Sequence, residues 1–505
     1  MLNNLKALVV VLVLAGVAFH LARPLCLRYM TAEALDRRRN VWLALTIVGF
    51  ISPTFWLYAL FAIALLSWAG ARDENPLALY VLVTFTVPDA RFYLPTFLIN
   101  QLFDLTQTRL LSLVVLIPLI VRSWKNPALA ADNKLRLPDC FLLSFCVLQV
   151  VLQFPYESIT ATMRRAFLLN IDIFVLFYAF SRIPDRPKLA EVVACFALAC
   201  AVMVPIGIFE WARGWHLYTG LADQWGDPNE FAFIFRGGGL RSQAATGHSI
   251  GLAYVLAVTL GFLLYLRSRS ERKWFDWFSI GSIALALYST GSRAGWIMAM
   301  VVAAVFVMSR PGAARKLAGA AAVGALTLAV MYVTPLKESV IDRLPIIGNT
   351  DQDTVQYREQ LYDISMPLIR QNPWFGDPFV TRNMESLRQG QGIIDIVNGY
   401  LFTALFYGLV GLLLQMGGML MGLWKAGSAF VRVRTIDNDA GMLGAALVAV
   451  FVASLLFVAT AGFGPTIYLM AGLLLSYSRC IGRAEAALGV PANHAAPQML
   501  RRGVT

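Results

Sequence analysis

Charged residues are scarce in this chain of 505 residues, where Asp, Glu, Lys and Arg make up 14% and hydrophobic residues 58%. The mean hydropathy is +0.64. A soluble protein carries about 25% charged residues. Apolar stretches of about 17 to 25 residues, the length that crosses a bilayer, recur from end to end. They lack the alternating pattern of a membrane barrel, so the sequence predicts an all-α, polytopic integral membrane protein.

Cysteine and histidine are also few, with six and four residues. The cysteines form neither a CxxC pair nor a Cys/His ligand set, which argues against disulfides and structural zinc. The sequence lacks a Walker A motif, an HExxH motif and paired acidic motifs that would hold a metal. We therefore expect no metal and no cofactor. The net charge of +12 fits the excess of Lys and Arg in inner loops of membrane proteins, and we expect no nucleic acid partner.

The apolar runs predict about 12–15 transmembrane helices in one integral-membrane domain, residues 1–478. The first run is interpreted as a retained span, and Pro53 leaves open whether the second and third spans form one kinked element. Residues 479–505 are expected to form a disordered tail. The expected spans are about 7–22, 41–52, 54–70, 75–88, 107–122, 139–153, 166–181, 189–208, 247–266, 276–291, 294–309, 317–334, 398–424, 440–459 and 463–478.

Basic loops give the orientation, because strict alternation of the spans places all six on one face. That face and the tail are therefore expected to be cytoplasmic. Two long loops, about 209–246 and 335–397, then fall on the periplasmic or extracellular side. Within the second, apolar residues at helical spacing predict an amphipathic helix from about Thr354 to Gln371, which lies on the membrane or caps a cavity. The basic loops are 23–39, 122–136, 181–188, 267–273, 309–316 and 425–434.

Three arginines on the outer side have unusual settings. Arg241 precedes the span that begins near Gly247, Arg293 stands between two apolar runs with almost no loop, and Arg358 opens the expected loop helix. Arginine at membrane depth is costly unless it faces a cavity or an anion, and its planar fork suits phosphate oxygens. Together they predict a pyrophosphate site. The alternatives are ordinary loop or helix-end positions and, for Arg293, a charge that only marks a topological break.

His248 lies where the segment "FRGGGLRSQAATGHSIGL" passes from polar loop to apolar span. It is either a boundary residue or a general base for a sugar hydroxyl. The glycines do not form a nucleotide loop, since the GxGxxG register is missing. Spacing alone selects none of the outer carboxylates as an alternative base. These are Glu210, Asp223, Asp227, Glu230, Asp342, Glu359, Asp363, Asp377 and Asp395.

Three segments, within about 235–415, together resemble the O-antigen ligase and polymerase superfamily. "LRSQAATGHSIGLAYVL" resembles its Arg-x-x-small-x-x-x-His stretch, and "LALYSTGSRAGWIMAMV" its Thr-x-Ser-Arg-(Gly/Ala) signature. "YREQLYDISMPLIRQNPWFGDPF" followed by "VNGYLFTALFYGLVGLLL" resembles its large periplasmic loop and next helix. The order of the three segments and the layout of the spans also agree with that family.

The resemblance implies a metal-independent, inverting glycosyltransferase at the periplasmic face of the bacterial inner membrane. Its fold would be a GT-C-like helical bundle, and its donor a glycan on undecaprenyl pyrophosphate. Arg241, Arg293 and Arg358 would bind the pyrophosphate and stabilise charge on the leaving group. Besides the substrate and the bilayer, the expected partners are chain-length regulator or export proteins of a polysaccharide.

One position departs from the family pattern. Ligases carry a histidine just before the Asn of the post-loop motif, where this chain has Val397. The departure favours a polymerase of surface or secreted polysaccharide over a ligase, while a transporter or flippase remains a weaker alternative. His248, Asp395 and Asp363 become candidates for the vacant role. Asn398 and Tyr400 are expected on the acceptor side, with a helix cap as the other interpretation of Asn398.

Overall fold

A computed structural model gives the arrangement of most of the chain. The predicted span 317–334 lies outside the described residues except for 318 and 319, as do 335–351 of the second long loop and the last part of the tail. The structure describes residues 2–93, 103–226, 235–236, 239–310, 312–313, 315, 318–319, 352–388 and 392–487.

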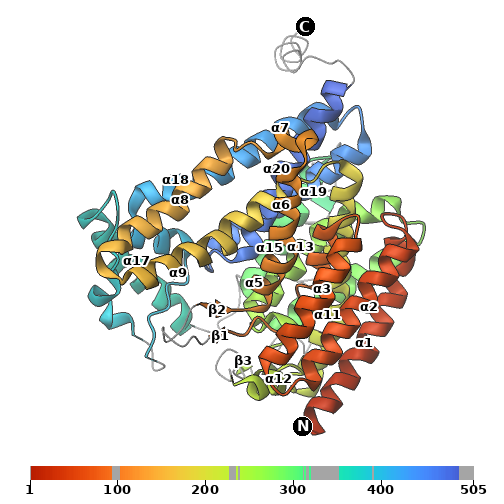
Figure 1. The fold of residues 1–505 in the computed structure, drawn as a ribbon, viewed down its shortest axis with the longest axis horizontal. Coiled ribbons are helices and arrows are strands. Elements are labelled where there is room, and N and C mark those ends of the chain that lie inside the picture. The colour runs from red at the N-terminus through yellow and green to blue at the C-terminus, as the bar shows by residue number, and fades with distance from the viewer. Residues whose placement is uncertain are drawn as a thin grey trace.

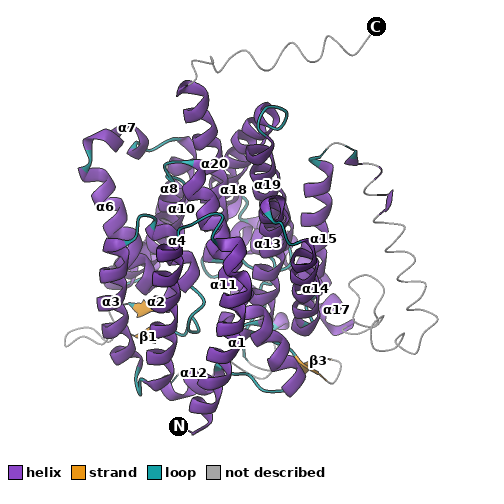
Figure 2. Cartoon of the chain, turned by 90° about the vertical axis from the view of Figure 1, so that its right-hand side faces the viewer, coloured by secondary structure: helices purple, strands orange, loops and turns teal. Residues whose placement is uncertain are grey.

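Helices make up nearly all of the described structure (Figure 1, Figure 2). Two short antiparallel hairpins, β1 (Phe92–Tyr93) with β2 (Asp104–Leu105) and β3 (Phe235–Arg236) with β4 (Gly239–Leu240), are its strands. The helices are α1 (Leu2–Cys26), α2 (Ala32–Ile51), α3 (Phe55–Arg72), α4 (Pro76–Val83), α5 (Gln107–Leu111), α6 (Ile117–Lys125), α7 (Ala130–Asn133), α8 (Leu137–Gln153), α9 (Ile159–Leu169), α10 (Leu176–Phe180), α11 (Arg186–Arg213), α12 (Thr219–Trp225), α13 (Ser249–Leu266), α14 (Lys273–Thr290), α15 (Arg293–Met308), α17 (Gln352–Gln371), α18 (Gly399–Val433), α19 (Asn438–Val458) and α20 (Pro465–Ala487).

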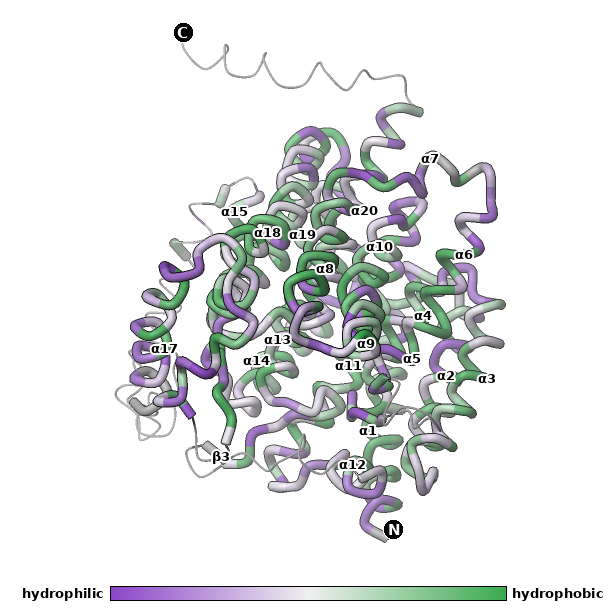
Figure 3. The backbone as a smooth tube through the Cα atoms, turned by 60° about the vertical axis from the view of Figure 1, so that its left-hand side comes forward, coloured by the Kyte–Doolittle hydropathy of each residue, from purple (hydrophilic) through white to green (hydrophobic). Residues whose placement is uncertain are grey.

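Eight helical segments among the described residues are long and apolar enough to cross a bilayer. The other expected spans within the described ranges coincide with shorter or more polar helices, such as α4 and α15. Figure 3 shows green, apolar colours along the helices of the bundle, whereas α17 is largely purple. The prediction of an all-α polytopic membrane protein is confirmed. The eight segments are Asn3–Cys26, Phe55–Arg72, Gln107–Lys125, Leu137–Tyr156, Arg186–Arg213, Ser249–Arg269, Gly399–Val433 and Asn438–Val458.

The centre of the bundle is formed by α11, α13 and α19. Their apolar windows are 72%, 78% and 78% buried, against 33% for α3 and α8, as expected for helices that are hydrophobic on all sides. Gly261 of α13 allows close packing there, because an added Cβ would lie 2.4 Å from Val450 of α19 and 2.9 Å from Val302 of α15. Small residues at such crossings let helix backbones approach in a membrane bundle.

The basic loops gather at one end of the bundle, which is the end where α7 lies in Figure 1. Arg28 pairs with Glu271 at 2.8 Å, and Arg269 with Asp439 at 2.8 Å, so that loops far apart in sequence are joined. These contacts place the basic loops together, as the sequence predicts. We call this end of the bundle the basic end. Further ion pairs here are Arg186–Asp437, Arg432–Glu485 and Arg483–Asp132.

The expected loop helix is present as α17. Its apolar face, with Leu361, Ile364 and Leu368, packs with Leu405 of α18 in a small second core. The adjoining helix α18 is broken at Gly408, where φ is 65° and ψ is −169°. Only a residue without a Cβ takes this conformation readily, and an added Cβ here would lie 2.2 Å from the Trp374 carbonyl oxygen.

The turn "NPWFGDP" after α17 fills this break in α18. The amides of Leu409 and Val410 donate to the carbonyls of Pro373 and Trp374 at 2.8 and 3.1 Å. In return, the Asp377 amide donates to the Leu405 carbonyl at 2.8 Å. Backbone groups freed inside a membrane helix need such partners. The second long loop is therefore fixed to the bundle through α18.

The structure resolves the alternative left open at Pro53 and revises one sequence-based boundary. The second and third expected spans are separate helices, α2 and α3, which pack on each other on either side of Pro53. The tail was expected to begin after Ser478, but α20 continues to Ala487. The reason is tertiary: Arg479 is buried and donates to the Ser181 carbonyl at 2.9 Å, so this part of the chain packs against the bundle.

Candidate active site

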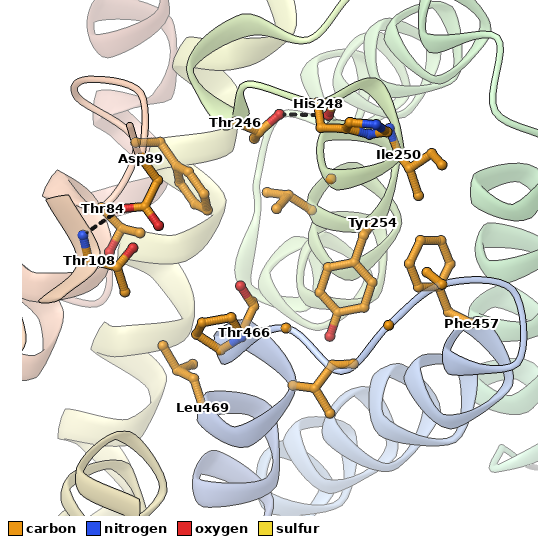
Figure 4. A pocket seen from close by; sticks show the side chains of 18 of the residues that line it. Thr84, Asp89, Thr108, Thr246, His248, Ile250, Tyr254, Phe457, Thr466 and Leu469 are labelled. Carbon is orange, nitrogen blue, oxygen red and sulfur yellow. Dashed lines mark hydrogen bonds between the residues drawn. The ribbon is translucent and has the colours of Figure 1, made fainter. Parts of the chain in front are cut away.

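A cavity of about 500 Å³ opens at the end of the bundle opposite the basic end. Its walls come from α4, the segment 245–255, residues 395–397, and the connection from α19 to α20. Figure 4 shows Asp89, Thr84 and Thr108 on one side and His248 and Ile250 on the other, with Tyr254 below His248 and with Thr466 and Leu469 lower in the view. The cavity combines hydroxyls, carboxylates and aromatic rings, a surface suited to a sugar.

His248 lines this cavity and begins α13 as its N-cap residue. Its Nδ1 accepts a hydrogen bond from the Ile250 amide at 3.2 Å. A neutral imidazole whose Nδ1 accepts carries its proton on Nε2, so this tautomer offers a donor rather than a base. Reduced contact with water in the cavity and the positive charge of Arg241 lower the pKa of His248, while Asp395 opposes the shift. His248 is therefore the boundary residue that caps α13, and its ring also lines the cavity; its role as a site residue stays a prediction.

Asp395 lines the same cavity, although nearly 150 residues separate it from His248. Its backbone is held from both sides by Tyr357 of α17: the Tyr357 hydroxyl donates to the Asp395 carbonyl at 2.9 Å and accepts from the Asp395 amide at 3.1 Å. The Asp395 side chain is exposed to the cavity and makes no hydrogen bond or ion pair with another described residue. A carboxylate in this position can accept a proton.

Asp89 is a cavity residue that sequence reasoning missed. It follows α4, and its carboxylate accepts a hydrogen bond from the Thr108 amide at 2.8 Å (Figure 4). The carboxylates predicted from the sequence belong to the two long loops, whereas Asp89 lies in the first quarter of the chain. Its place after an apolar run, in "VPDAR", gives only a weak signal.

Arg241 is buried, with 8% of its surface exposed, beside His248 rather than at the membrane surface. Its Nε donates to the Thr290 carbonyl at 2.8 Å, and the next residue, Ser242, bonds through its hydroxyl to Ser289 at 2.6 Å. Both contacts lie on the last turn of α14, directly before Arg293. The fold therefore brings Arg241 to the turn that carries Arg293.

Glu210 and His216 hold the Arg241 segment in place. The fully buried Glu210 carboxylate accepts from the amides of Leu217, Gln243 and Ala244 at 3.0, 3.0 and 2.8 Å. His216, 1% exposed, donates from Nε2 to the Arg241 carbonyl at 3.0 Å. Burial lowers the pKa of His216 to about 4, so it is neutral at pH 7. The sequence placed Glu210 among possible bases, but its geometry is that of a structural anchor.

Arg293 is the first residue of α15, and Ser292 caps that helix by accepting from the Gly295 amide at 3.3 Å. The side chain is half-buried beside the helix N-terminus. The partial positive charge of that terminus adds to the guanidinium, and the two together attract an anion.

Arg358 is exposed on α17, next to Tyr357 and therefore one residue from the group that holds Asp395. None of the three predicted pyrophosphate arginines, Arg241, Arg293 and Arg358, is among the residues that line the cavity.

Asn398 and Tyr400 follow the cavity segment 395–397. Asn398 is the N-cap of α18, because its side chain accepts from the amides of Tyr400 and Leu401 at 3.0 and 3.2 Å. The Tyr400 hydroxyl donates to the Leu455 carbonyl at 2.6 Å. Neither residue lines the cavity, whereas Val397 does. The cap interpretation of Asn398 is confirmed.

The remaining outer carboxylates lie away from the cavity or outside the described residues. Asp377 accepts from the Phe379 amide at 2.8 Å within its turn, and Asp363 is exposed on α17. Asp227, Glu230 and Asp342 are outside the described residues. Within the described ranges, no three His, Cys, Asp or Glu side chains group in a way that could hold a metal ion.

The fold and the cavity define a polytopic all-α membrane protein with a largely apolar cavity at one end of its bundle, into which a few hydroxyl, carboxylate and imidazole groups project. Residues 277–416 match the family model described as O-antigen ligase. The matched segment contains most of α14, then α15, α17 and the first part of α18. It includes Arg293, Arg358 and Asp395. This match supports the resemblance to the O-antigen ligase and polymerase family that the motifs indicate, without separating its branches. The family implies a glycosyltransferase type of activity. No curated protein matches the chain.

Proposed function

We propose that this protein is a polymerase that joins oligosaccharide repeat units linked to undecaprenyl pyrophosphate, at the periplasmic face of a bacterial inner membrane. The observation that carries the proposal is the meeting of His248 and Asp395 in one cavity beside Arg241. That cavity holds groups able to receive a proton and to donate a hydrogen bond, and the nearby Arg241 can attract an anion. The end of the bundle opposite the basic loops is the expected periplasmic side.

The donor pyrophosphate would lie toward Arg241 and the N-terminus of α15, with Arg293 at that terminus. Arg241 is held at Thr290, so both arginines belong to one structural unit. A guanidinium binds phosphate oxygens through two parallel N–H groups, and such fixed donors stabilise charge that develops on a leaving group. Arg358 would approach the same anion from α17, on the loop that is fixed to α18.

The reaction is a displacement at the anomeric carbon of the donor glycan. The acceptor hydroxyl oxygen forms the new bond, and the bond from the anomeric carbon to the pyrophosphate oxygen breaks with its electron pair on that oxygen. The hydroxyl proton passes to the Asp395 carboxylate, which is free of intramolecular bonds among the described residues. His248 donates from Nε2 to a substrate oxygen, because its Nδ1 is engaged in the helix cap. Attack from the face opposite the leaving group inverts the configuration.

Val397 favours a polymerase over a ligase. By the resemblance, ligases carry a histidine at this position for acceptor activation. Val397 lines the cavity here and can neither accept nor donate a proton. A ligase that transfers lipid-linked glycan to lipid A-core or protein is the second candidate, because the family includes such enzymes.

The purified protein, supplied with lipid-linked repeat units alone, tests the proposal. A polymerase elongates them, whereas a ligase requires its second acceptor. Arg293→Ala or Arg358→Ala should abolish high-mass polysaccharide at unchanged protein level. Normal polymer from both variants would reject the arginine mechanism, and no elongation by the wild type with a competent substrate would reject the polymerase.

A further inference from the structure

A second polar cavity, of about 300 Å³, lies at the basic end of the bundle, remote from the candidate active site. It is formed between the start of α8, the later part of α18 and the last turns of α20. Its charged lining consists of four cations and one carboxylate, which gives a net charge of +3. The charged residues are Arg136, Lys425, Arg479, Arg483 and Asp132.

The carboxylates at this cavity do not saturate its cations. Asp132 pairs with Arg483 at 2.9 Å and reaches Arg136 only at 3.9 Å. Asp139, buried behind the lining, bonds to Arg182 at 3.0 Å and is 3.5 Å from Arg479. Two negative charges are thus shared among five cations, counting Arg182.

Several cationic groups at this cavity have donors without a partner among the described residues. Arg479 is 7% exposed, and its buried Nε has no hydrogen-bond partner in the described part of the chain; the same holds for the buried Nε of Arg483. Lys425 forms no hydrogen bond or ion pair with any other described residue. A buried donor without a partner costs about 1–3 kcal/mol, and more for a charged group, so the fold retains these groups at an energetic cost. An anion in this cavity would pair with the Lys425 ammonium and the Arg136 guanidinium, and its charge would stabilise the buried guanidinium groups behind them.

We propose that this cavity is a binding site for a phosphate group. Three guanidinium groups and an ammonium within one cavity match the oxygens of a phosphate, which guanidinium groups bind in pairs. The phosphate is carried either by the headgroup of an anionic phospholipid or by a soluble phosphate. Basic pockets between helices on the inner side of membrane proteins are positioned for such headgroups. The proposal is independent of the reaction at the other end.

Lys425 and Arg136 are suitable residues for the test, because neither anchors the fold. Lys425 has no described partner, and Arg136 is exposed, whereas Arg479 holds the Ser181 carbonyl. The test variant is Lys425→Gln with Arg136→Gln. The matched control is Arg122→Gln with Arg434→Gln, which removes two exposed cations from the same end but outside the cavity.

Binding is measured on the purified full-length chain in detergent, with phosphatidylglycerol, phosphatidylcholine and inorganic phosphate as probes in native mass spectrometry and thermal shift. We expect the cavity variant to bind phosphatidylglycerol about tenfold or more weakly than wild type, and the control within about twofold, given roughly 1 kcal/mol for each basic residue near an anionic lipid.

Phosphatidylglycerol binding that inorganic phosphate does not displace identifies the lipid as the source. Binding of inorganic phosphate that depends on Lys425 and Arg136 identifies a soluble anion. The proposal is overturned if neither anion binds the wild type, or if cavity and control variants lose affinity equally.

Discussion

The two ends of the bundle use charged side chains in different ways. At the basic end, arginines pair with carboxylates from other loops, as Arg28 does with Glu271 and Arg269 with Asp439. At the cavity end, Arg109 also pairs with Asp172 at 2.6 Å, but several carboxylates bind backbone amides: Glu210 accepts three and Asp89 accepts one. Among the described residues, Asp395 is held through its backbone. Ion pairs therefore join segments at both ends, while at the cavity end carboxylates also position the chain around a cavity and leave Asp395 exposed.

Among the residues that line the cavity, the largest effect is expected from changing the proton acceptor. Asp395→Asn should lower turnover about 10²–10⁴-fold, the usual contribution of a general base, with little change in thermal stability. His248→Gln should reduce it far less, since glutamine can both cap α13 and donate to the substrate. Elongation of lipid-linked repeat units measures both variants. If His248→Gln abolishes activity while Asp395→Asn retains it, the assigned roles are reversed.

Removing the Glu210 anchor should disturb the fold more than any change at the basic end. Glu210→Ala leaves three backbone amides without an acceptor. Each buried donor without a partner costs about 1–3 kcal/mol, and some of these amides will bond to water instead. We therefore expect the free energy of unfolding to fall by about 3–5 kcal/mol. The measurement is the melting temperature and yield of purified protein. A melting temperature equal to that of the wild type would show that these bonds are dispensable.

His216 gives a prediction on acid stability. Its pKa is about 4 in the folded protein, against about 6.5 in an unfolded chain, so between these values only the unfolded chain takes up the proton. Stability is complete above about pH 6.5 and falls as the pH drops toward 4, by up to about 3 kcal/mol from this residue.

The variant His216→Gln tests this contribution, because glutamine keeps a donor for the Arg241 carbonyl and does not titrate. The melting temperature of the variant should fall less between pH 7 and pH 4.5 than that of the wild type. Identical pH dependence in the two proteins would exclude His216 as a source of acid sensitivity.

The smallest effect is expected at the basic end, from Arg28→Gln. The pair with Glu271 is largely exposed, and such pairs contribute about 0–1 kcal/mol. Melting temperature and turnover should both stay close to wild type. A large loss of turnover from this variant would contradict the assignment of the reaction to the cavity end and of a structural role to the basic end.

Much of the candidate site could be inferred from the sequence because its signals are local. His248 and Arg241 share one short segment, and Arg293 marks the break between two apolar runs. Asp89 and His216 gave no such signal, since their places depend on contacts across the fold with Thr108 and the Arg241 carbonyl. Glu210 was chosen only as a possible base, because a sequence does not reveal that a carboxylate will meet three backbone amides.

The sequence by itself determined the all-α membrane class, the amphipathic helix α17 and the common location of the basic loops. Those properties follow from the length of the apolar runs, the helical spacing of apolar residues and the distribution of charge, all of which are local features of the sequence. Only the tertiary structure decided that α20 continues beyond Ser478, that "NPWFGDP" fills the break at Gly408, and that Asp395 and His248 share a cavity. These features depend on the packing of segments far apart in sequence, where a buried polar group must find its partner.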